Sequence, residues 1–326
     1  MNNLTTTSQK GLATKKQTFS MYIGQDAIRK SINNIVGGEN GQRFMTAIIS
    51  AVSTNAALSE CTHTTILSAA LLGESLKLSP SPQLGQYYMV PFKKKGKNGE
   101  PDETVATFVL GYKGYIQLAI RSGYYKKINV ISIKEGELRK YNPLEEEIEV
   151  DLIEDEELRE NTPTVGYYAM FEYQNGFKKS IYWSKKKMVA HADKYSAAFS
   201  ADAVKGAKPE YNKVSFADFE AGKVTEKDMW KYSSFWYKDF DGMAHKTLLR
   251  QLISKWGIMS IEMQKAFEAD EAVIKQDLAP EFVENDAVEI KDKIEQSNEV
   301  VTTVEPEVVS KEEDFDFFNS ENSDKE

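Results

Sequence analysis

The spacing of the apolar residues is helical in the first quarter of the chain. Between Met21 and Leu78, apolar side chains recur every three or four positions in three successive stripes. Residues at this spacing share one side of a helix and pack against a core, so the pattern predicts three core helices. The stripes are Ile28, Ile32 and Ile35; Phe44, Ala47, Ile48, Ala51 and Val52; and Ile66, Ala69, Ala70 and Leu72.

Beyond Pro82 the apolar pattern becomes typical of β-strands. Asn175-Gly176 separates two of the strand-like segments, and this dipeptide is a strong signal for a β-hairpin. A polar loop, 93–103, connects the first two segments and carries four Lys residues within 93–97. We therefore expect an antiparallel, hairpin-rich sheet. Its predicted strands are 87–92, 104–110, 127–133, 165–173 and 177–183.

Three later segments are again helical in pattern. One covers 112–122 and ends at Gly123, the second begins after Ser184 as its N-cap and runs to about Phe199, and the third covers 234–255. Residues 201–228 mix Gly, Pro, Lys and Asp without a period and are predicted to be a loop insertion. The fold class expected is α+β, with N-terminal helices and an antiparallel sheet packed on helices.

Composition excludes several classes of protein. The 326 residues are 41% hydrophobic, which permits a real core, and the single Cys excludes a disulfide framework. No run of 18 apolar residues is present, and the N-terminus lacks the apolar stretch of a secretory signal. We therefore expect no membrane association and a cytoplasmic location.

The net charge of −9 conceals two oppositely charged parts. Residues 261–326 carry 21 acidic residues and six Lys, whereas residues 1–260 carry 35 Lys and Arg against 29 acidic residues. Such asymmetry favours a polyanionic partner for the basic part. The boundaries expected are a flexible basic arm over 1–20, a folded body over 21–268 and an acidic, largely disordered tail over 269–326.

The common catalytic and metal-binding motifs are missing from the sequence. It contains neither the phosphate-binding loop G-x-x-x-x-G-K-[ST] nor the zinc motif H-E-x-x-H. The acidic run 145–147 falls in a predicted loop without the spacing of a nuclease metal site. We therefore predict no catalytic residue, no metal ligand and no cofactor.

The predicted helix 112–122 carries a polar stripe. Lys113, Gln117 and Arg121 are four residues apart and share one side, a pattern suited to a sugar-phosphate backbone or to a solvated surface. Gly111 and Gly114 remove side chains from the helix start, so another backbone or a phosphate can approach. Lys126 and Lys127 extend the positive charge. Exposed aromatic residues could stack on bases, for example in Tyr124-Tyr125 and Tyr167-Tyr168.

The predicted helix 234–255 is apolar on several sides and still carries cations, among them Lys238, Lys246 and Arg250. A buried cation needs an anionic partner, because uncompensated burial costs several kcal/mol. The partner is either an internal carboxylate, with Asp239, Asp241 and the acidic loop 143–160 as candidates, or a phosphate in a groove.

The tail contains an acidic and aromatic motif over residues 312–318. Such motifs dock in basic, apolar pockets of partners, fold back onto a DNA groove of their own protein, or only increase solubility. All three alternatives stay open. The candidate partner-binding residues are Asp314, Phe315, Asp316, Phe317 and Phe318.

Several motifs in order resemble the RecT family of phage and prophage single-strand annealing proteins, over roughly residues 20–265. The matching segments include Tyr88-Met89-Val90-Pro91; Gly111-Tyr112-Lys113-Gly114; Arg121-Ser122-Gly123; Tyr182-Trp183; and the helix Asp239-Phe240-Asp241-Gly242-Met243-Ala244-His245-Lys246-Thr247-Leu248-Leu249-Arg250. Gly242 and His245 depart from the Ala and Lys of many relatives. Residues 93–103 and 201–228 are longer than usual.

The resemblance implies an α+β core related in layout to the Redβ and Rad52-like annealing proteins. It implies a protein that coats single-stranded DNA, assembles into helical homo-oligomers (filaments or rings) and anneals complementary strands through a duplex intermediate without ATP. The implied partners are a phage exonuclease and the single-strand binding protein of a bacterial host. DNA contacts are expected from Lys113, Gln117, Arg121, Lys126, Lys127, Lys238, Lys246, Thr247 and Arg250.

Two other functions are compatible with the residues. A nuclease or other DNA-processing enzyme would use a metal site made of carboxylates. An adaptor would recruit partners through its acidic tail, and its body would not bind DNA.

Overall fold

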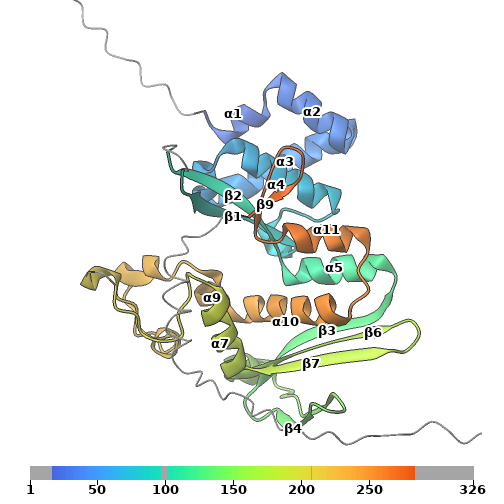
Figure 1. Cartoon of the computed structure of the whole chain (residues 1–326), viewed down its shortest axis with the longest axis vertical. Coiled ribbons are helices and arrows are strands. Elements are labelled where there is room, and N and C mark those ends of the chain that lie inside the picture. Colours follow the sequence, from blue (N-terminus) through green and yellow to red (C-terminus); the bar gives the residue numbers. More distant parts are fainter. Residues whose placement is uncertain (1–16, 97–100, 207, 283–326) are drawn as a thin grey trace, which may run out of the picture. The chain divides into compact units, whose positions relative to one another are not determined.

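The computed structural model describes residues 17–96, 101–206 and 208–282. Its N-terminal region contains four α-helices and two short 3₁₀ helices (Figure 1). The three predicted stripes are confirmed in part. Ile32, Ile48 and Ile66 are completely buried, but Ile35 is 58% exposed and Ala47 is exposed as well. The helices are α1 (Phe19–Ile23), α2 (Asp26–Val36), α3 (Gly38–Thr54) and α4 (His63–Ser75), with η1 (Ala56–Glu60) after α3 and η2 (Pro82–Leu84) after α4.

A first antiparallel sheet has the strand order β1-β2-β8-β9. Strands β1 (Tyr87–Lys94) and β2 (Glu103–Leu110) form the predicted hairpin, and α4 packs on β2. The other two strands, β8 (Ala272–Ile274) and β9 (Pro280–Glu281), come from the segment predicted to be the start of the tail. All three side chains of β8 are buried, so the ordered body extends beyond the expected end at residue 268.

A second antiparallel sheet has the order β3-β6-β7. Strands β6 (Thr164–Tyr173) and β7 (Lys178–Ser184) form the hairpin expected at Asn175-Gly176, where Gly176 has a φ of 85°. Strand β3 (Tyr125–Lys134) pairs with β6. The acidic segment after β3 forms a small hairpin, β4 (Leu138–Asn142) and β5 (Glu147–Val150), followed by the short helix α6 (Glu156–Asn161).

Helix α10 (Phe240–Trp256) packs on all three strands of the second sheet and against α5 (Tyr112–Ser122). Helix α11 (Ile261–Ala269) packs on α5 and β2, so these helices link the two sheets. The predicted single helix 234–255 is two helices, because the backbone angles of Asp239 are not helical. Its carboxylate accepts a hydrogen bond from the Gly242 amide at 2.9 Å and caps α10, which follows α9 (Phe235–Lys238).

Helix α7 (Lys185–Tyr195) packs on β6 and β7, and Ser184 caps it as predicted, although it ends four residues before the expected Phe199. The predicted insertion 201–228 is mostly irregular. Its short elements are η3 (Pro209–Tyr211), α8 (Phe216–Glu220) and η4 (Glu226–Lys231). The buried ring of Phe216 attaches the insertion by stacking on Phe240, with ring centroids 4.8 Å apart. The described residues include no helix that is both long and apolar enough to cross a membrane.

Candidate nucleic-acid interface

The junction between β2 and α5 is built around two glycines. The amide of Gly111 donates a hydrogen bond to the Gln86 carbonyl at 2.9 Å. A Cβ at Gly111 would lie 2.1 Å from the Gly85 carbonyl oxygen, and a Cβ at Gly114 would lie 2.1 Å from that of Gln86. The sequence left open whether another backbone or a phosphate approaches here. In the structure, the backbone preceding β1 occupies this position.

Part of the polar stripe of α5 is exposed to solvent, and part of it is hydrogen-bonded within the protein. Tyr115, Leu118 and Ala119 are buried, as predicted, and Lys113 and Gln117 are exposed on the other side. Arg121 instead folds onto the end of α4 and donates to the carbonyl oxygens of Leu76 at 2.5 Å and Lys77 at 3.0 Å. A cation at the C-terminus of a helix is stabilised by the carbonyls there, so Arg121 joins α5 to α4.

Two lysines of β3 are exposed. Lys126 forms an ion pair with Glu172 on β6 at 2.7 Å, and this hydrogen bond lowers the pKa of Glu172. Lys127 also lowers the Glu172 pKa through its charge. Both ammonium groups are therefore near one internal carboxylate and still accessible from solvent.

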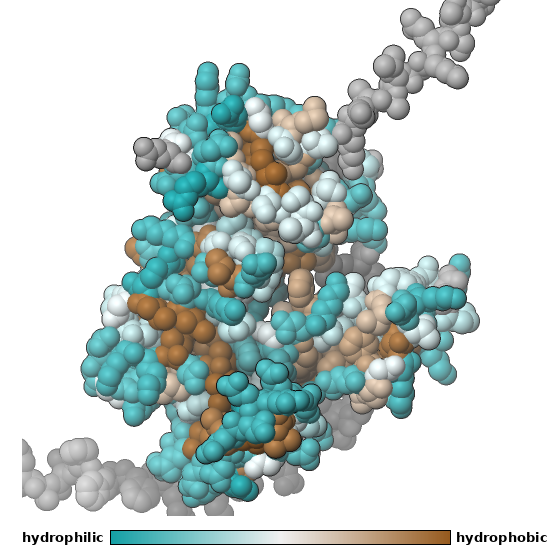
Figure 2. All heavy atoms as spheres, turned by 180° about the vertical axis from the view of Figure 1, so that it is seen from behind, coloured by the Kyte–Doolittle hydropathy of each residue, from teal (hydrophilic) through white to brown (hydrophobic). Residues whose placement is uncertain are grey.

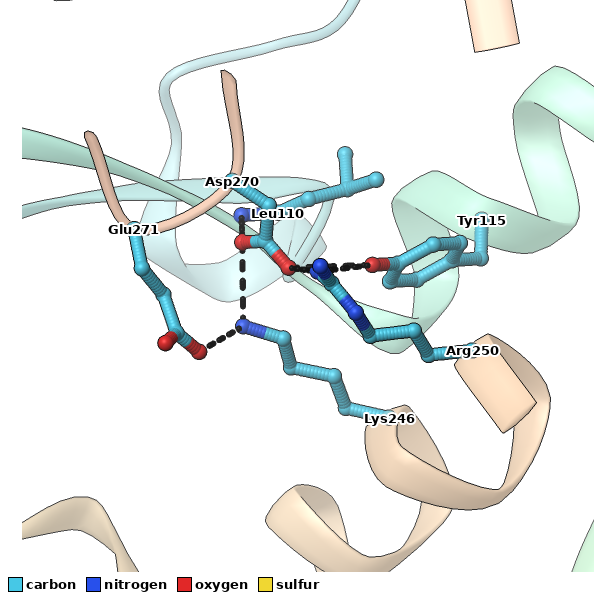
Figure 3. A network of polar contacts seen from close by, with 6 residues as sticks. All are labelled: Leu110, Tyr115, Lys246, Arg250, Asp270 and Glu271. Atoms are coloured by element: carbon cyan, nitrogen blue, oxygen red, sulfur yellow. Dashed lines mark hydrogen bonds and ion pairs between the residues drawn. The ribbon is translucent and has the colours of Figure 1, made fainter. Parts of the chain in front are cut away.

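The cations of α10 are bound by carboxylates from the turn between α11 and β8 (Figure 3). Lys246 is 5% exposed, and its Nζ lies 3.0 Å from Asp270 Oδ1 and 3.1 Å from Glu271 Oε1. Arg250 donates to Asp270 Oδ2. Asp270 also accepts from the Leu110 amide at 2.8 Å and from the Tyr115 hydroxyl at 3.0 Å. We call these six residues the Asp270 network.

In the Asp270 network, the cations of α10 are paired with carboxylates of the protein itself. Burial disfavours the charged lysine, but Asp270 and Glu271 outweigh that effect and raise the pKa of Lys246. Lys246 in turn lowers the pKa of Glu271. The partners are internal carboxylates, although not the Asp239 and Asp241 that the sequence offered as candidates. Residues 270 and 271 fall where the acidic tail was expected to begin, and the sequence therefore did not indicate this role.

Asp241 and His245 connect α10 to the second sheet. Asp241 accepts hydrogen bonds from Tyr167 at 2.6 Å, Ser132 at 3.0 Å and Thr164 at 3.2 Å. His245 Nε2 is 3.0 Å from Ser132 Oγ, and burial lowers the pKa of His245. This histidine, which departs from the pattern of relatives, therefore makes contacts inside the protein.

A small cavity of about 60 Å³ opens between β1, α5, α9 and α10. Tyr88 and Phe235 line it, with ring centroids 6.0 Å apart, and Lys246 lies in its wall. Lys113 Nζ is 6.0 Å from the Tyr112 ring centroid, and Lys238 Nζ is 5.9 Å from that of Phe235. The structure thus places two exposed predicted cations beside one aromatic cavity. Sequence analysis missed Phe235, because nothing in its pattern separates an exposed ring from a core ring.

The other residues that the sequence predicted as DNA contacts or stacking rings are mostly buried or half-buried. Thr247 is half-buried on α10, and of the predicted stacking candidates Tyr125 and Tyr167 belong to the core. Among the described residues, no group of His, Cys, Asp and Glu is arranged to hold a metal ion. The motif 312–318 and most of the basic arm lie outside the described residues.

Comparison with known proteins identifies relatives along most of the chain. The model of the RecT family matches residues 42–290. The uncharacterized protein YqaK of Bacillus subtilis strain 168 is 35% identical over 276 residues, which cover 84% of this chain and 80% of YqaK. Protein RecT of Escherichia coli K12 is 22% identical over 261 residues, which cover 79% of this chain and 82% of RecT.

Proposed function

The chain belongs to the RecT family, whose members anneal single-stranded DNA in recombination, and on this premise we propose that it binds single strands as a homo-oligomer and anneals them without a nucleotide. The observation that carries the proposal is the pair of exposed lysines, Lys113 and Lys238, beside the cavity of Tyr88 and Phe235. Cations bind phosphates at any sequence, and rings stack on any base.

We assign different roles to the predicted DNA contacts. Lys113, Gln117, Lys127 and Lys238 are exposed and can reach phosphates directly, as can Lys126 beside its ion pair. The Arg250 side chain is 40% exposed. The outer edge of its guanidinium group can therefore contact a phosphate while the inner edge stays paired with Asp270. The Lys246 side chain is only 6% exposed, and we infer that it positions α10 against the turn between α11 and β8.

Annealing follows from this arrangement by simple electrostatics. Two DNA strands repel each other through their phosphates, and a row of cations on the first strand reduces that repulsion. A strand held by its backbone leaves base edges available for pairing. Since pairing then proceeds downhill, no nucleotide hydrolysis is required. The protein then holds the annealed duplex as a bound intermediate.

The homo-oligomer is supported by the surface of the protein. Apolar patches interrupt the hydrophilic face seen in Figure 2. The exposed apolar side chains include Ile120, Ile258 and Ile261, which are 55%, 45% and 68% exposed. Contiguous apolar patches on a surface are typical of contacts with another protein. We further propose a phage exonuclease and a host single-strand binding protein as partners, with the motif 312–318 as the contact.

The test is annealing of two complementary oligonucleotides in EDTA without ATP, followed by imaging of the complexes. Wild-type protein should accelerate annealing and form oligomers on DNA. The variant Lys113→Ala/Lys238→Ala should bind single strands more weakly. The plot of log affinity against log salt should also become less steep, by about 1.4 in slope, since each phosphate contact contributes about 0.7.

The matched control is Lys30→Ala, which removes an exposed lysine from α2 and should leave affinity and slope unchanged. An unchanged slope in the double variant would show that these lysines do not contact DNA. Magnesium-dependent degradation of labelled DNA by the pure protein would instead indicate a nuclease.

A further inference from the structure

A row of aromatic rings runs from the end of β7 along the surface of helix α7, and its two rings on the helix, His191 and Tyr195, belong to none of the sequence motifs. The ring of Trp183, at the end of β7, lies 5.3 Å from that of His191, and the His191 ring lies 4.6 Å from that of Tyr195. Two lysines contact the same rings. Lys187 Nζ is 4.5 Å from the Trp183 centroid, and Lys194 Nζ is 5.4 Å from the Tyr195 centroid. We call these five residues the α7 ladder.

The helical spacing explains why the ladder faces outward. Lys187, His191 and Tyr195 are four residues apart and share one side of the helix, whereas Met188 and Ala192 are completely buried against the sheet. Tyr195 is 68% exposed, so most of its ring is accessible to a ligand. The ladder therefore does not belong to the packing surface that holds α7 in place.

The charge of the ladder is not neutralised within the described part of the protein. Lys185, at the start of α7, forms an ion pair with Glu220 at 2.7 Å, but Lys187 and Lys194 have no carboxylate within ion-pair distance among the described residues. Burial lowers the pKa of His191, and the charges of Lys187 and Lys194 lower it further. The region around His191 thus has a positive potential that favours an anionic ligand.

We propose that the α7 ladder binds single-stranded DNA, with bases stacked on Tyr195 and His191 and phosphates bound by Lys187 and Lys194. Single-stranded nucleic acid presents flat rings and anionic groups at alternating positions, and the ladder offers the complementary alternation of rings and cations. The site extends the proposed function, on which it rests. It adds a second surface for DNA on α7, apart from Lys113 on α5.

The experiment compares two oligonucleotides of equal length, one of oligo(dT) and one with the same backbone but abasic at every position. Tyr195→Ala should weaken binding of oligo(dT) about tenfold, as expected for one lost base stack, and His191→Ala/Tyr195→Ala should weaken it further. Neither variant should change binding of the abasic oligonucleotide. Tyr195→Phe keeps the ring and should restore binding of oligo(dT).

The matched control is Tyr211→Ala, which removes a 48% exposed ring from η3 and should bind both oligonucleotides like the wild type. Equal losses on both oligonucleotides would overturn the stacking role, and so would unchanged binding of oligo(dT) by the double variant. If wild-type protein bound neither oligonucleotide, the proposed function itself would fail. If it bound both and the ladder variants did too, only the ladder would fail.

Discussion

Asp270 is a single residue on which several elements depend. Its side chain is completely buried, and it accepts hydrogen bonds from β2, α5 and α10. A buried carboxylate is tolerable only when such donors replace its lost water. The same carboxylate is the reason that Lys246 can stay charged inside the protein.

Replacing Asp270 with Ala should therefore destabilise the protein strongly. Lys246 and Arg250 would lose the carboxylate that they share, and removing one partner of a buried ion pair costs about 3–5 kcal/mol. Urea denaturation followed by circular dichroism measures the loss. The control is Glu271→Gln. The Glu271 side chain is 64% exposed, so this variant should lose no more than about 1 kcal/mol of its free energy of unfolding. Equal stability of the two variants would contradict the importance of Asp270.

The stability of the protein should also depend on His245. Burial lowers its pKa below the ordinary value of 6.5, and the charges of Asp241 and Asp239 oppose this only in part. As the pH falls below 6.5, the unfolded chain takes up this proton first, so the free energy of unfolding decreases until the folded pKa is passed. Above pH 6.5 this residue contributes no pH dependence.

The variant His245→Gln should accordingly lose less stability than the wild type between pH 7.5 and pH 5.5. Urea denaturation at both pH values provides the comparison. His191→Gln serves as the reference, because burial also lowers the pKa of His191 and its loss should have an effect of the same sign. A wild-type free energy of unfolding that stayed constant over this range would show that His245 is not held neutral.

At the residue scale, the sequence predicted local properties better than long-range partners. The need for close approach at Gly111 and Gly114 followed from their position at a helix start, and a Cβ at either position would lie 2.1 Å from a carbonyl oxygen. The need of Lys246 for an anion was also visible. That Asp270 supplies it was not, because only the tertiary fold brings these two positions together.

Among the elements, α5 agrees with its prediction because both of its ends have local causes. Gly111 begins it, and Gly123, with a φ of 76°, ends it in a left-handed conformation. The division between α9 and α10 was missed, since the apolar pattern continues across Asp239. The hairpin β4–β5 was missed because its alternating apolar residues are few and lie within the acidic segment.

The junction at the start of α5 allows a sharp test. Gly114→Ala places a methyl group against the Gln86 carbonyl oxygen, which should cost about 1–3 kcal/mol by overpacking. Gly38→Ala is the matched control at the start of α3, where a Cβ meets nothing within 4 Å and the change should be neutral or slightly stabilising. Thermal denaturation of both variants gives the comparison. A stable Gly114→Ala variant would mean that β1 and α5 can separate.

For the whole molecule, the folded body must include the segment that follows α11. Strand β8 pairs with β2, and the Asp270 network binds α10 to the same segment. Charge segregation predicted an acidic tail from residue 269, a boundary that lies before these residues. Charge alone cannot find such a boundary, because Asp270 and Glu271 are acidic and structural at once.

Truncation should show where the body ends. A chain ending at residue 268 lacks Asp270 and β8 and should unfold or bind DNA poorly, whereas a chain ending at residue 282 should fold and retain single-strand binding. Circular dichroism and a gel shift with labelled oligonucleotide measure the two properties. A well-folded, DNA-binding chain of 268 residues would contradict the role of the added strands.

The pairing of β2 with the segment after α11 has a consequence for synthesis in the cell. The Leu110 amide and the Asp270 carboxylate that binds it are 160 positions apart in the chain. Translation proceeds from the N-terminus, so β2 and Lys246 leave the ribosome long before their partners exist. Until then, Lys246 has no Asp270 to pair with, and the nascent chain cannot complete the body one part at a time. Folding of the body is therefore completed late, only after almost the whole body has emerged from the ribosome.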